Sequence, residues 1–592
     1  MVKQAREEQV NGGQPLVSID SSTEGLSLIR SQSMYESLRH AEYDIASGIG
    51  EIADNGIEAN ATNIWIQARI EKKKNEKKEY DYISEIAVID DGFGMDTDVQ
   101  NRCLVLGDSP RPQKANGGRG IGRFGVGLTL GGISLGRRLE VYSRDDLNKQ
   151  FTYTYIDLNL IAVGEQKVVP TPVEASPPKE YANMLENKTG TIIILKVCDR
   201  LLDGKKGKVT EQLAGLANYL GRTYRKFIYG GLNIWLNNEK IYLHDPLYRL
   251  GPTRFDAKNP NQPDLKAKLR GTKQISLEIP NKPGEFADIQ ITMTILPAEW
   301  RKTAGDGGRP FARERKIDEN QGVSILRANR EVLYSHVPYI TGKKGESTAK
   351  AHDRFWGCEI SFPPELDEYF TVKFIKRGAE PVSFLKEQIR REIAETVDSL
   401  REEIQRDWGK EKVERANKTD AFKDAADVMA DADQTQPKGK RGTDVPEEKY
   451  EKELDLITDQ IVDEKKTREE KRKELEERPY SIVPVSFPQI FFFETVHMLN
   501  KTIVKLNVNH PFYQNVFEPL CGSIEEMDEE SDIYLGTLSD DQRKIRQAFM
   551  LLLLSYAKSE SFFEGNDQIL MNLRNQWGIA LANVINTAEI RG

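Results

Sequence analysis

Glu51 and Asn55 are the first pair of side chains in this sequence whose types and spacing could do chemistry. They stand four residues apart in a helical pattern, so both side chains lie on one face of the helix. A carboxylate in a pocket can orient and deprotonate a water for attack on a γ-phosphate. The amide oxygen of Asn55 is a hard ligand of the kind that Mg²⁺ binds. The pair therefore predicts a general base beside a metal ligand.

The segment from Asp90 to Met95 reads DDGFGM and follows a predicted strand. A carboxylate at the end of that strand only accepts hydrogen bonds, which matches the exocyclic amino group of adenine and not the keto oxygen of guanine. Gly92 and Gly94 let the backbone turn tightly beneath the base. We expect Asp90, Gly92, Gly94 and Met95 to bind the nucleotide.

A glycine-rich segment runs directly into a predicted helix over 128–135. Backbone N–H groups at such a helix start form a ready anion site. A Rossmann turn would need a strand directly before the glycines and an acidic residue about 20 residues beyond, whereas here the irregular stretch SPRPQKANGG precedes them. We therefore expect a lid over the phosphates. Its nucleotide-binding residues are Gly120, Gly122, Arg123, Phe124, Gly125, Val126 and Gly127.

These motifs require a helix and a set of strands to position them. An apolar stripe predicts a long helix over 34–60, and alternation of apolar and polar residues predicts a strand over 64–70. A second strand over 83–89 delivers Asp90. Further strands are expected at 138–143, 151–157 and 191–197. Together they predict a helix-backed, mostly antiparallel sheet that ends near residue 200.

The rest of the chain divides by composition into three further regions, which gives an α+β fold overall. A second α/β domain is expected over 201–383. Residues 384–478 form a charged helical region whose apolar residues from Leu385 to Trp408 step by three and four, a seam for another helix or a partner chain. A linker is expected near 409–446, and a small, mainly helical domain over 479–592.

Composition indicates a soluble, globular protein. The 592 residues are 38% hydrophobic and 30% charged, with a net charge of −9. The four cysteines lie far apart, without the spacing of a zinc site or a disulfide framework. The apolar runs are too short to span a bilayer. We expect a cytoplasmic protein with no membrane contact.

In order and spacing, these motifs resemble those of the GHKL ATPases, which include gyrase B, heat-shock-ninety chaperones, histidine kinases, MutL and the microrchidia (MORC) proteins. The family pattern E-x-x-D-N-x-x-D-A is similar to Glu51–Ala59, with Glu58 in place of Asp. The family's closing Gly-Thr corresponds to Gly190-Thr191. The resemblance implies a Bergerat-type helix-on-sheet ATPase domain that binds ATP and Mg²⁺, contacts ATP through Thr191, hydrolyses ATP through Glu51, and forms a homodimer.

Segments beyond residue 200 resemble the transducer domain of prokaryotic MORC-like ATPases. They are Arg222–Arg225 with Asp245–Leu247, Gln321–Val332 and Phe362–Glu368. That resemblance implies a catalytic transducer lysine, for which Lys376 is the candidate and Lys373 the alternative. It also implies a role in DNA handling or antiviral (anti-phage) defence.

The partner and the biological role stay open among several alternatives. Basic loops at 301–316 and 343–354 could hold the phosphates of duplex DNA in a salt-dependent way. A heat-shock-ninety-like chaperone and a regulatory subunit that recruits a nuclease or helicase are the other readings. Residues 479–592 are expected to serve dimerisation or partner docking.

Overall fold

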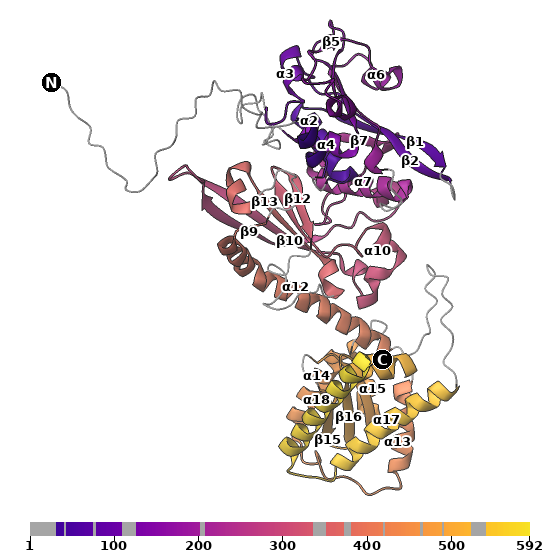
Figure 1. Cartoon of the computed structure of the whole chain (residues 1–592). Coiled ribbons are helices and arrows are strands. Elements are labelled where there is room, and N and C mark those ends of the chain that lie inside the picture. The colour runs from indigo at the N-terminus through magenta and orange to yellow at the C-terminus, as the bar shows by residue number, and fades with distance from the viewer. Residues whose placement is uncertain are drawn as a thin grey trace, which may run out of the picture. The chain divides into compact units, whose positions relative to one another are not determined.

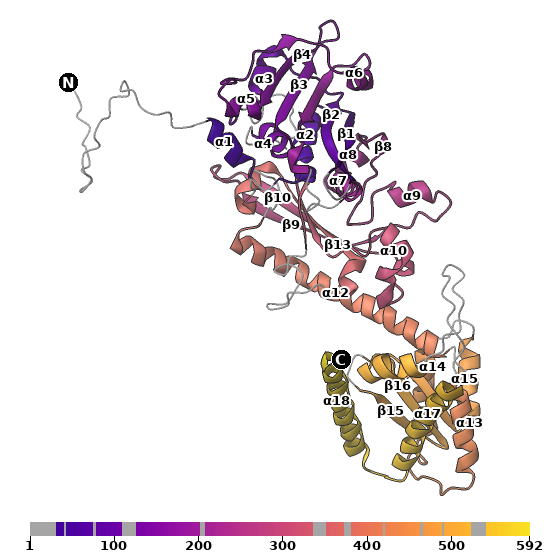
Figure 2. The same ribbon diagram turned by 45° about the vertical axis from the view of Figure 1, so that its right-hand side comes forward.

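The computed structural model describes residues 31–40, 43–74, 79–108, 126–201, 208–335, 351–371, 380–417, 421–461, 466–487, 491–521 and 540–591. The described residues form two compact units (Figures 1 and 2), one that ends at Tyr242 and one that begins at Leu243. The first unit contains one sheet, and the second contains two sheets with separate apolar cores.

The first unit is built on an eight-stranded sheet with the order β5-β4-β3-β6-β2-β1-β7-β8. Neighbouring strands run antiparallel, except that β7 lies parallel to β1. The strands are β1 (Asn63–Lys74), β2 (Glu79–Asp90), β3 (Arg138–Arg144), β4 (Thr152–Asp157), β5 (Val173–Glu174), β6 (Gly190–Lys196), β7 (Asn233–Leu236) and β8 (Glu239–Lys240). The strands expected from sequence alternation are thus present, with ends that differ by a few residues.

Helices cover both faces of this sheet. Ile64 and Ile66 of β1 point to the main core, which they share with Ile49, Ile52 and Ile57 of α2. A smaller core on the other face contains Ala87 and Ile89 of β2, because successive side chains of a strand alternate between faces. The helices are α1 (Ser31–Leu38), α2 (Ile45–Glu58), α3 (Thr97–Arg102), α4 (Gly127–Leu135), α5 (Leu158–Ala162), α6 (Lys179–Leu185), α7 (Val209–Thr223) and α8 (Arg225–Tyr229).

Two expectations for this unit need correction. The single helix over 34–60 is two helices, because Asp44 caps the start of α2 and exchanges hydrogen bonds with Ser47. The unit also extends to Tyr242 rather than to residue 200, because β7 pairs with β1 and completes the sheet.

The second unit begins with a five-stranded sheet of order β12-β11-β13-β10-β9. The long helix α12 (Ser383–Asn417) carries the expected apolar seam, and its residues Leu385, Ile389 and Ile393 are fully buried. These side chains pack in the same core as the sheet. The expectation that another helix covers the seam was therefore wrong, because the sheet covers it. The other elements are β9 (Lys268–Glu278), β10 (Phe286–Ile295), β11 (Val323–Arg327), β12 (Arg330–Ser335), β13 (Trp356–Phe362), α9 (Arg254–Lys258) and α10 (Pro310–Glu314).

The C-terminal part of this unit has a three-stranded sheet of order β14-β16-β15 with helices packed on it. The expectation of a mainly helical domain therefore missed a sheet. The linker expected near 409–446 is mostly helical, since α12 continues to Asn417 and α13 (Ala421–Asp433) buries Phe422 and Met429. The elements are β14 (Tyr480–Val485), β15 (Phe493–Met498), β16 (Lys501–Asn507), α14 (Glu447–Gln460), α15 (Arg468–Glu477), α16 (Glu518–Cys521), α17 (Asp540–Glu560) and α18 (Asp567–Arg591).

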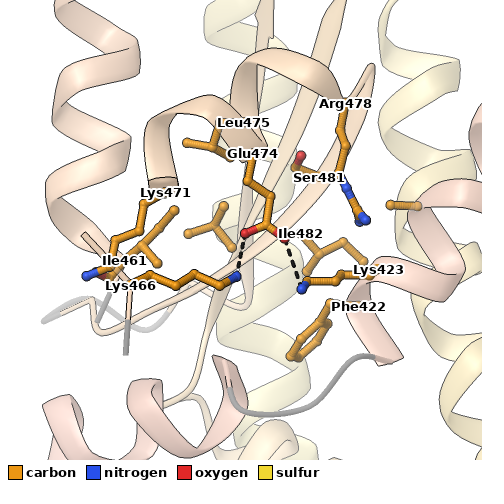
Figure 3. A pocket seen from close by; sticks show the side chains of 12 residues that line it. Phe422, Lys423, Ile461, Lys466, Lys471, Glu474, Leu475, Arg478, Ser481 and Ile482 are labelled. Carbon is orange, nitrogen blue, oxygen red and sulfur yellow. Dashed lines mark hydrogen bonds and ion pairs between the residues drawn. The ribbon is translucent and has the colours of Figure 1, made fainter. Parts of the chain in front are cut away.

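A small cavity lies where α13, α15 and β14 meet in this part of the chain (Figure 3). Among the described residues, no helix is long and apolar enough to cross a membrane.

Candidate functional site

Helix α2 is the element around which the predicted site is built. Glu51 is 4% exposed, and Asn55, one turn further along, is half-buried. Gly56 lies against the end of β2, since a Cβ on Gly56 would stand 3.0 Å from Cβ of Asp90. The structure therefore brings the Glu51–Asn55 helix and the Asp90 motif, which are separate in sequence, into direct contact.

The segment after Asp90 folds around the C-terminal end of α2. The N–H of Phe93 donates to the carbonyl of Ala59 over 3.0 Å. A Cβ on Gly92 would lie 2.6 Å from Cβ of Ala59, so glycine is required for this close approach. The N–H of Gly92 donates to Oδ1 of Asp90 over 3.0 Å, which orients the buried carboxylate.

Gly94 is required for two independent reasons. Its φ of +72° lies in the left-handed region that side-chain-bearing residues rarely adopt. A Cβ there would also lie 2.2 Å from the carbonyl oxygen of Arg144. The glycines of this motif thus allow the turn to pass closely between α2 and β3.

A buried hydroxyl pair connects this turn to β3 and β6. Ser143 Oγ accepts the N–H of Met95 over 2.8 Å and lies 3.0 Å from Oγ1 of Thr191. Asp90 and Thr191 are register partners on the adjacent strands β2 and β6. Met95 and Thr191 are therefore in the neighbourhood that the sequence predicted. Ser143 was missed, because an isolated serine in a strand carries no sequence signal.

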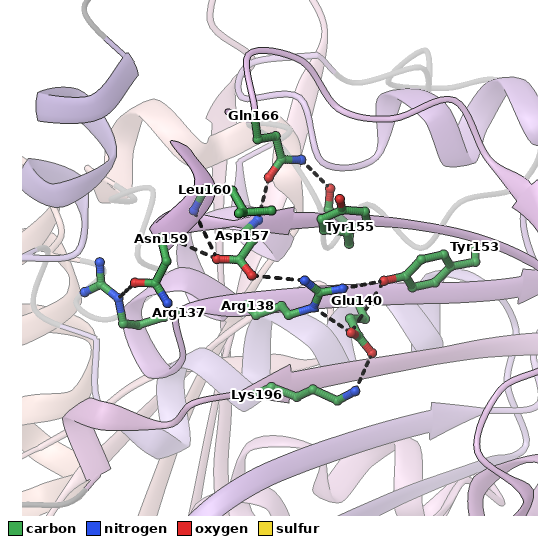
Figure 4. Close-up of polar contacts among 10 residues, drawn as sticks. All are labelled: Arg137, Arg138, Glu140, Tyr153, Tyr155, Asp157, Asn159, Leu160, Gln166 and Lys196. Atoms are coloured by element: carbon green, nitrogen blue, oxygen red, sulfur yellow. Dashed lines mark hydrogen bonds and ion pairs between the residues drawn. The ribbon is translucent and has the colours of Figure 1, made fainter. Parts of the chain in front are cut away.

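A network of polar side chains links β3, β4 and β6 (Figure 4). It lies on the face of the sheet opposite the main core. Glu140 lies 2.7 Å from Nε of Arg138 and 2.9 Å from Nζ of Lys196. Arg138 also reaches Asp157 over 3.0 Å and donates to the hydroxyl of Tyr153 over 2.9 Å. These contacts stabilise the strands that carry Ser143 and Thr191.

Helix α4 begins next to Glu51. A Cβ on Gly127 would lie 2.3 Å from Oε2 of Glu51, and one on Gly131 would lie 3.3 Å from its Cβ. The N-cap residue of α4 is Val126, whose apolar side chain makes no capping hydrogen bond to the first turn. The backbone N–H groups of this turn, which are donors of the kind that bind an anion, therefore lie beside the carboxylate of Glu51.

Tyr224, at the end of α7, positions the middle of α2. Its hydroxyl lies 2.7 Å from the carbonyl oxygen of Gly50 and 2.8 Å from Oδ1 of Asp54. Both Tyr224 and Asp54 are buried. The sequence placed Tyr224 in a segment that resembles the transducer domain and did not predict its contact with α2, since it is 170 residues away from Asp54.

Asp91, which follows Asp90 in the same motif, is held by hydrogen bonds from neighbouring segments. Its carboxylate accepts hydrogen bonds from the backbone and side chain of Asn63, from Thr62, and from Nζ of Lys188 over 2.9 Å. Burial by itself raises the pKa of Asp91, but these hydrogen bonds outweigh it and lower the pKa to about 2. Asp91 therefore ties the strand end to its neighbours as a permanent anion.

Several predicted site residues lie outside the described residues. They are the lid residues Gly120, Gly122, Arg123, Phe124 and Gly125, and both candidates for the transducer lysine, Lys373 and Lys376.

The donor set fits a magnesium ion held mainly by phosphate. Among the described residues, no group of three or more His, Cys, Asp or Glu side chains could hold a metal. Mg²⁺ commonly takes only one or two protein oxygens together with substrate phosphates and water. The amide oxygen of half-buried Asn55, one helical turn from Glu51, can supply such a ligand.

The basic loop 301–316 is used partly inside the protein. Arg301 is 4% exposed and pairs with Glu403 and Asp407 of α12. The guanidinium of Arg315 lies 3.7 Å from the ring centre of Phe255. The exposed basic residues of this loop are Lys302, Arg309 and Arg313. In the second loop, residues 343–350 lie outside the described residues, and Arg354 is half-buried.

Comparison with known proteins agrees with this geometry. Residues 43–191 match the family model of the histidine kinase-, DNA gyrase B- and HSP90-like ATPases. The match covers about a quarter of the chain and includes α2, the Asp90 motif and Thr191. No curated protein matches the chain. The fold and the match together support a GHKL-type ATPase domain, a class of domain that binds ATP.

Proposed function

We propose that this protein hydrolyses ATP at the site formed by α2, the Asp90 motif and the start of α4. The observation that carries the proposal is the contact of the Asp90 turn with α2, the helix that bears Glu51 and Asn55. In this arrangement the carboxylate of Asp90 accepts a hydrogen bond from the amino group of adenine, and Glu51 is the general base for the attacking water.

In the proposed site, Mg²⁺ would be bound mainly by the phosphates of ATP. Asn55 would hold it, and the ion would neutralise charge that develops on the transferred phosphoryl group. The N–H groups at the start of α4 bind phosphate oxygens beside Glu51. Thr191 and Met95 complete the pocket through their contacts with Ser143.

We further propose that ATP binding works as a clamp or switch between two copies of the chain. Proteins with this type of ATPase domain often dimerise, and the motif resemblance extends to the lid over 120–127 and to a transducer lysine, Lys376 or Lys373. Sizing the Glu51→Ala protein with and without ATP tests the clamp. We expect a doubling of mass with ATP, and an unchanged mass with ATP bound would refute it.

The exposed surface of α18 supports dimerisation or docking through the C-terminal region. Ile569, Leu573, Trp577 and Val584 are 47–67% exposed and recur at helical spacing. Between Asp567 and Glu589 the sequence holds a single charged residue, the buried Arg574. An apolar helix surface with so little charge is typical of an interface.

A pair of matched variants tests this surface. Leu573→Lys places a charge on the exposed apolar stripe, and Gln576→Lys places the same charge on a polar exposed position of the same helix. We expect Leu573→Lys to lower the fraction of dimer in sedimentation or light scattering, with no change for Gln576→Lys. Equal behaviour of the two variants would remove α18 from the interface.

For the biological role, we propose a MORC-like ATPase that acts on DNA, in DNA handling or antiviral defence. The support is the motif resemblance over the transducer region and the exposed Lys302, Arg309 and Arg313. Binding to duplex DNA should weaken steeply with salt. Lys302→Glu with Arg313→Glu should weaken it further, whereas Lys452→Glu, on an exposed face of α14, should not.

The ATPase rate distinguishes the alternatives. A DNA-acting enzyme is stimulated by duplex DNA at low salt, whereas a heat-shock-ninety-like chaperone responds to an unfolded client instead. A regulatory subunit hydrolyses ATP slowly until a nuclease or helicase partner is present. Absence of both DNA binding and DNA stimulation at low salt would reject the DNA role.

A further inference from the structure

The cavity in the C-terminal part of the chain has the size and lining of a small anion site. Its volume is about 80 Å³. About 10–15 Å³ of such space is enough to hold one water, so the cavity has room for several waters or for one small polyatomic group. Drug-sized ligands need at least about 300 Å³. A whole nucleotide is therefore too large to be enclosed.

Charged side chains of one sign dominate the lining. Four cationic side chains and one carboxylate meet there, which gives a formal charge of +3. Glu474 pairs with Lys466 over 2.6 Å and with Lys423 over 3.0 Å (Figure 3). Burial by itself raises the pKa of Glu474, but the two lysines outweigh it and lower the pKa, so Glu474 is ionised. Among the described lining residues, cations therefore outnumber carboxylates.

Lys471 and Arg478 are the two cations whose charge is least compensated by contacts with the described residues. Among the described residues, Nζ of Lys471 donates to the carbonyl oxygen of Ile461 over 3.0 Å, which is a neutral partner, and an ammonium group has three N–H donors. Arg478 lies 3.7 Å from Asp427, whose side chain is 62% exposed and therefore well screened by water. Lys471 and Arg478 are thus the side chains best placed to bind an additional anion.

The other walls strengthen this attraction. Phe422, Leu475 and Ile482 line the cavity with apolar surface, which lowers the local dielectric and strengthens charge–charge interactions. Ser481, 8% exposed, adds a hydroxyl that can donate a hydrogen bond. The donors come from α13, from α15 with its flanking residues, and from β14, so they surround the space on several sides.

We propose that this cavity binds one phosphate group, either inorganic phosphate or the phosphate of a small monoester. A phosphate dianion matches the excess of positive charge better than a carboxylate does, and it offers several acceptor oxygens to the surrounding donors. Glu474 limits the affinity, because it competes for Lys423 and Lys466 and repels the ligand. The site is separate from the proposed ATP site and independent of ATP hydrolysis.

Matched lysine variants of the full-length protein test the site. Lys471→Gln removes a cation that lines the cavity. Lys473→Gln removes a cation of the same helix that lies outside the lining, and the side chain of Lys473 is 74% exposed. Phosphate binding is measured by calorimetry in the presence of saturating ADP and Mg²⁺, which occupies the nucleotide site. We expect one phosphate per chain, at least tenfold weaker binding for Lys471→Gln, and a change under twofold for Lys473→Gln.

Glu474→Gln gives a test in the opposite direction. The substitution removes the competing carboxylate, so phosphate binding should tighten at least threefold. Repeating the titrations with glycerol 3-phosphate shows which source of phosphate the cavity prefers. Lack of saturable binding of both ligands by the wild-type protein would overturn the proposal, as would equal effects of Lys471→Gln and Lys473→Gln in folded proteins, or weaker binding by Glu474→Gln.

Discussion

The backbone of Gly127 approaches Glu51 so closely that a methyl group on Gly127 would lie 2.3 Å from the carboxylate oxygen Oε2. The first turn of α4 and the predicted general base are thus fitted to each other. Because Oε2 is at the end of a flexible side chain, a methyl group would displace the carboxylate rather than the backbone. Gly127 therefore sets where the carboxylate can stand.

Gly127→Ala should consequently impair turnover more than stability. We expect the ATPase rate to fall at least tenfold while the melting temperature changes little. Gly215→Ala, in helix α7, is the control, because a Cβ there meets nothing within 4 Å. It should leave the rate unchanged and stabilise the helix by about 0.5–1 kcal/mol. An unimpaired Gly127→Ala enzyme would contradict the assigned position of the base.

Glu51→Gln should separate ATP binding from ATP hydrolysis. The amide keeps the size of the side chain but cannot accept a proton from water. We expect turnover to drop about 10²–10⁴-fold, in the range of general-base contributions, with the affinity for ATP changed less than fivefold. Phosphate release and equilibrium binding of a fluorescent ATP analogue measure the two quantities. A parallel loss of both would show that Glu51 supports binding instead.

Gly94→Ala should destabilise the first unit strongly. It combines a strained φ of +72° with a Cβ that would lie 2.2 Å from the backbone oxygen of Arg144, an atom that cannot easily move. Gly107 has a similar φ of +80°, and no atom of the described residues lies within 4 Å of the position that its Cβ would take, so Gly107→Ala isolates the strain alone. That strain costs about 1–2 kcal/mol. Thermal unfolding should show a clearly larger loss for Gly94→Ala, and equal losses would discount the steric contact.

Asp91 should make folding sensitive to acid. Its pKa of about 2 lies below the value of about 3.9 expected in the unfolded chain, so the ionised group stabilises the native state. This contribution, roughly 2 kcal/mol, is complete above about pH 5 and is lost as the pH falls towards 2. Asp91→Asn should therefore be less stable at pH 7 and lose less stability on acidification. Asp98→Asn, at an exposed position, is the control.

Tyr224→Phe should destabilise the position of α2, although the side chain of Tyr224 is not one of the proposed nucleotide-binding residues. The substitution removes a buried hydroxyl that contacts Gly50 and Asp54, at a cost of about 1–3 kcal/mol. Because Glu51 and Asn55 are on the same helix, we expect the ATPase rate to fall as well. Tyr229→Phe, at a side chain that is 61% exposed, should change neither property. A fully active and stable Tyr224→Phe protein would remove the positioning role.

Local sequence patterns predicted the elements that depend on neighbours in the chain. The alternation in 64–70 and 83–89 gave β1 and β2, and the three- and four-residue steps from Leu385 gave α12. The spacing of Glu51 and Asn55 put both on α2, and the glycines after Asp90 marked a tight turn. These features follow from backbone geometry, which each short segment largely carries by itself.

Tertiary structure decided which surfaces meet. The apolar seam of α12 showed that one face is buried, but not that a sheet covers it. The parallel pairing of β7 with β1, the contact of Tyr224 with Asp54, and the neighbourhood of Ser143 and Thr191 join residues far apart in sequence. Periodicity identifies a buried face and leaves its partner open, because that partner depends on the free energy of packing the whole chain.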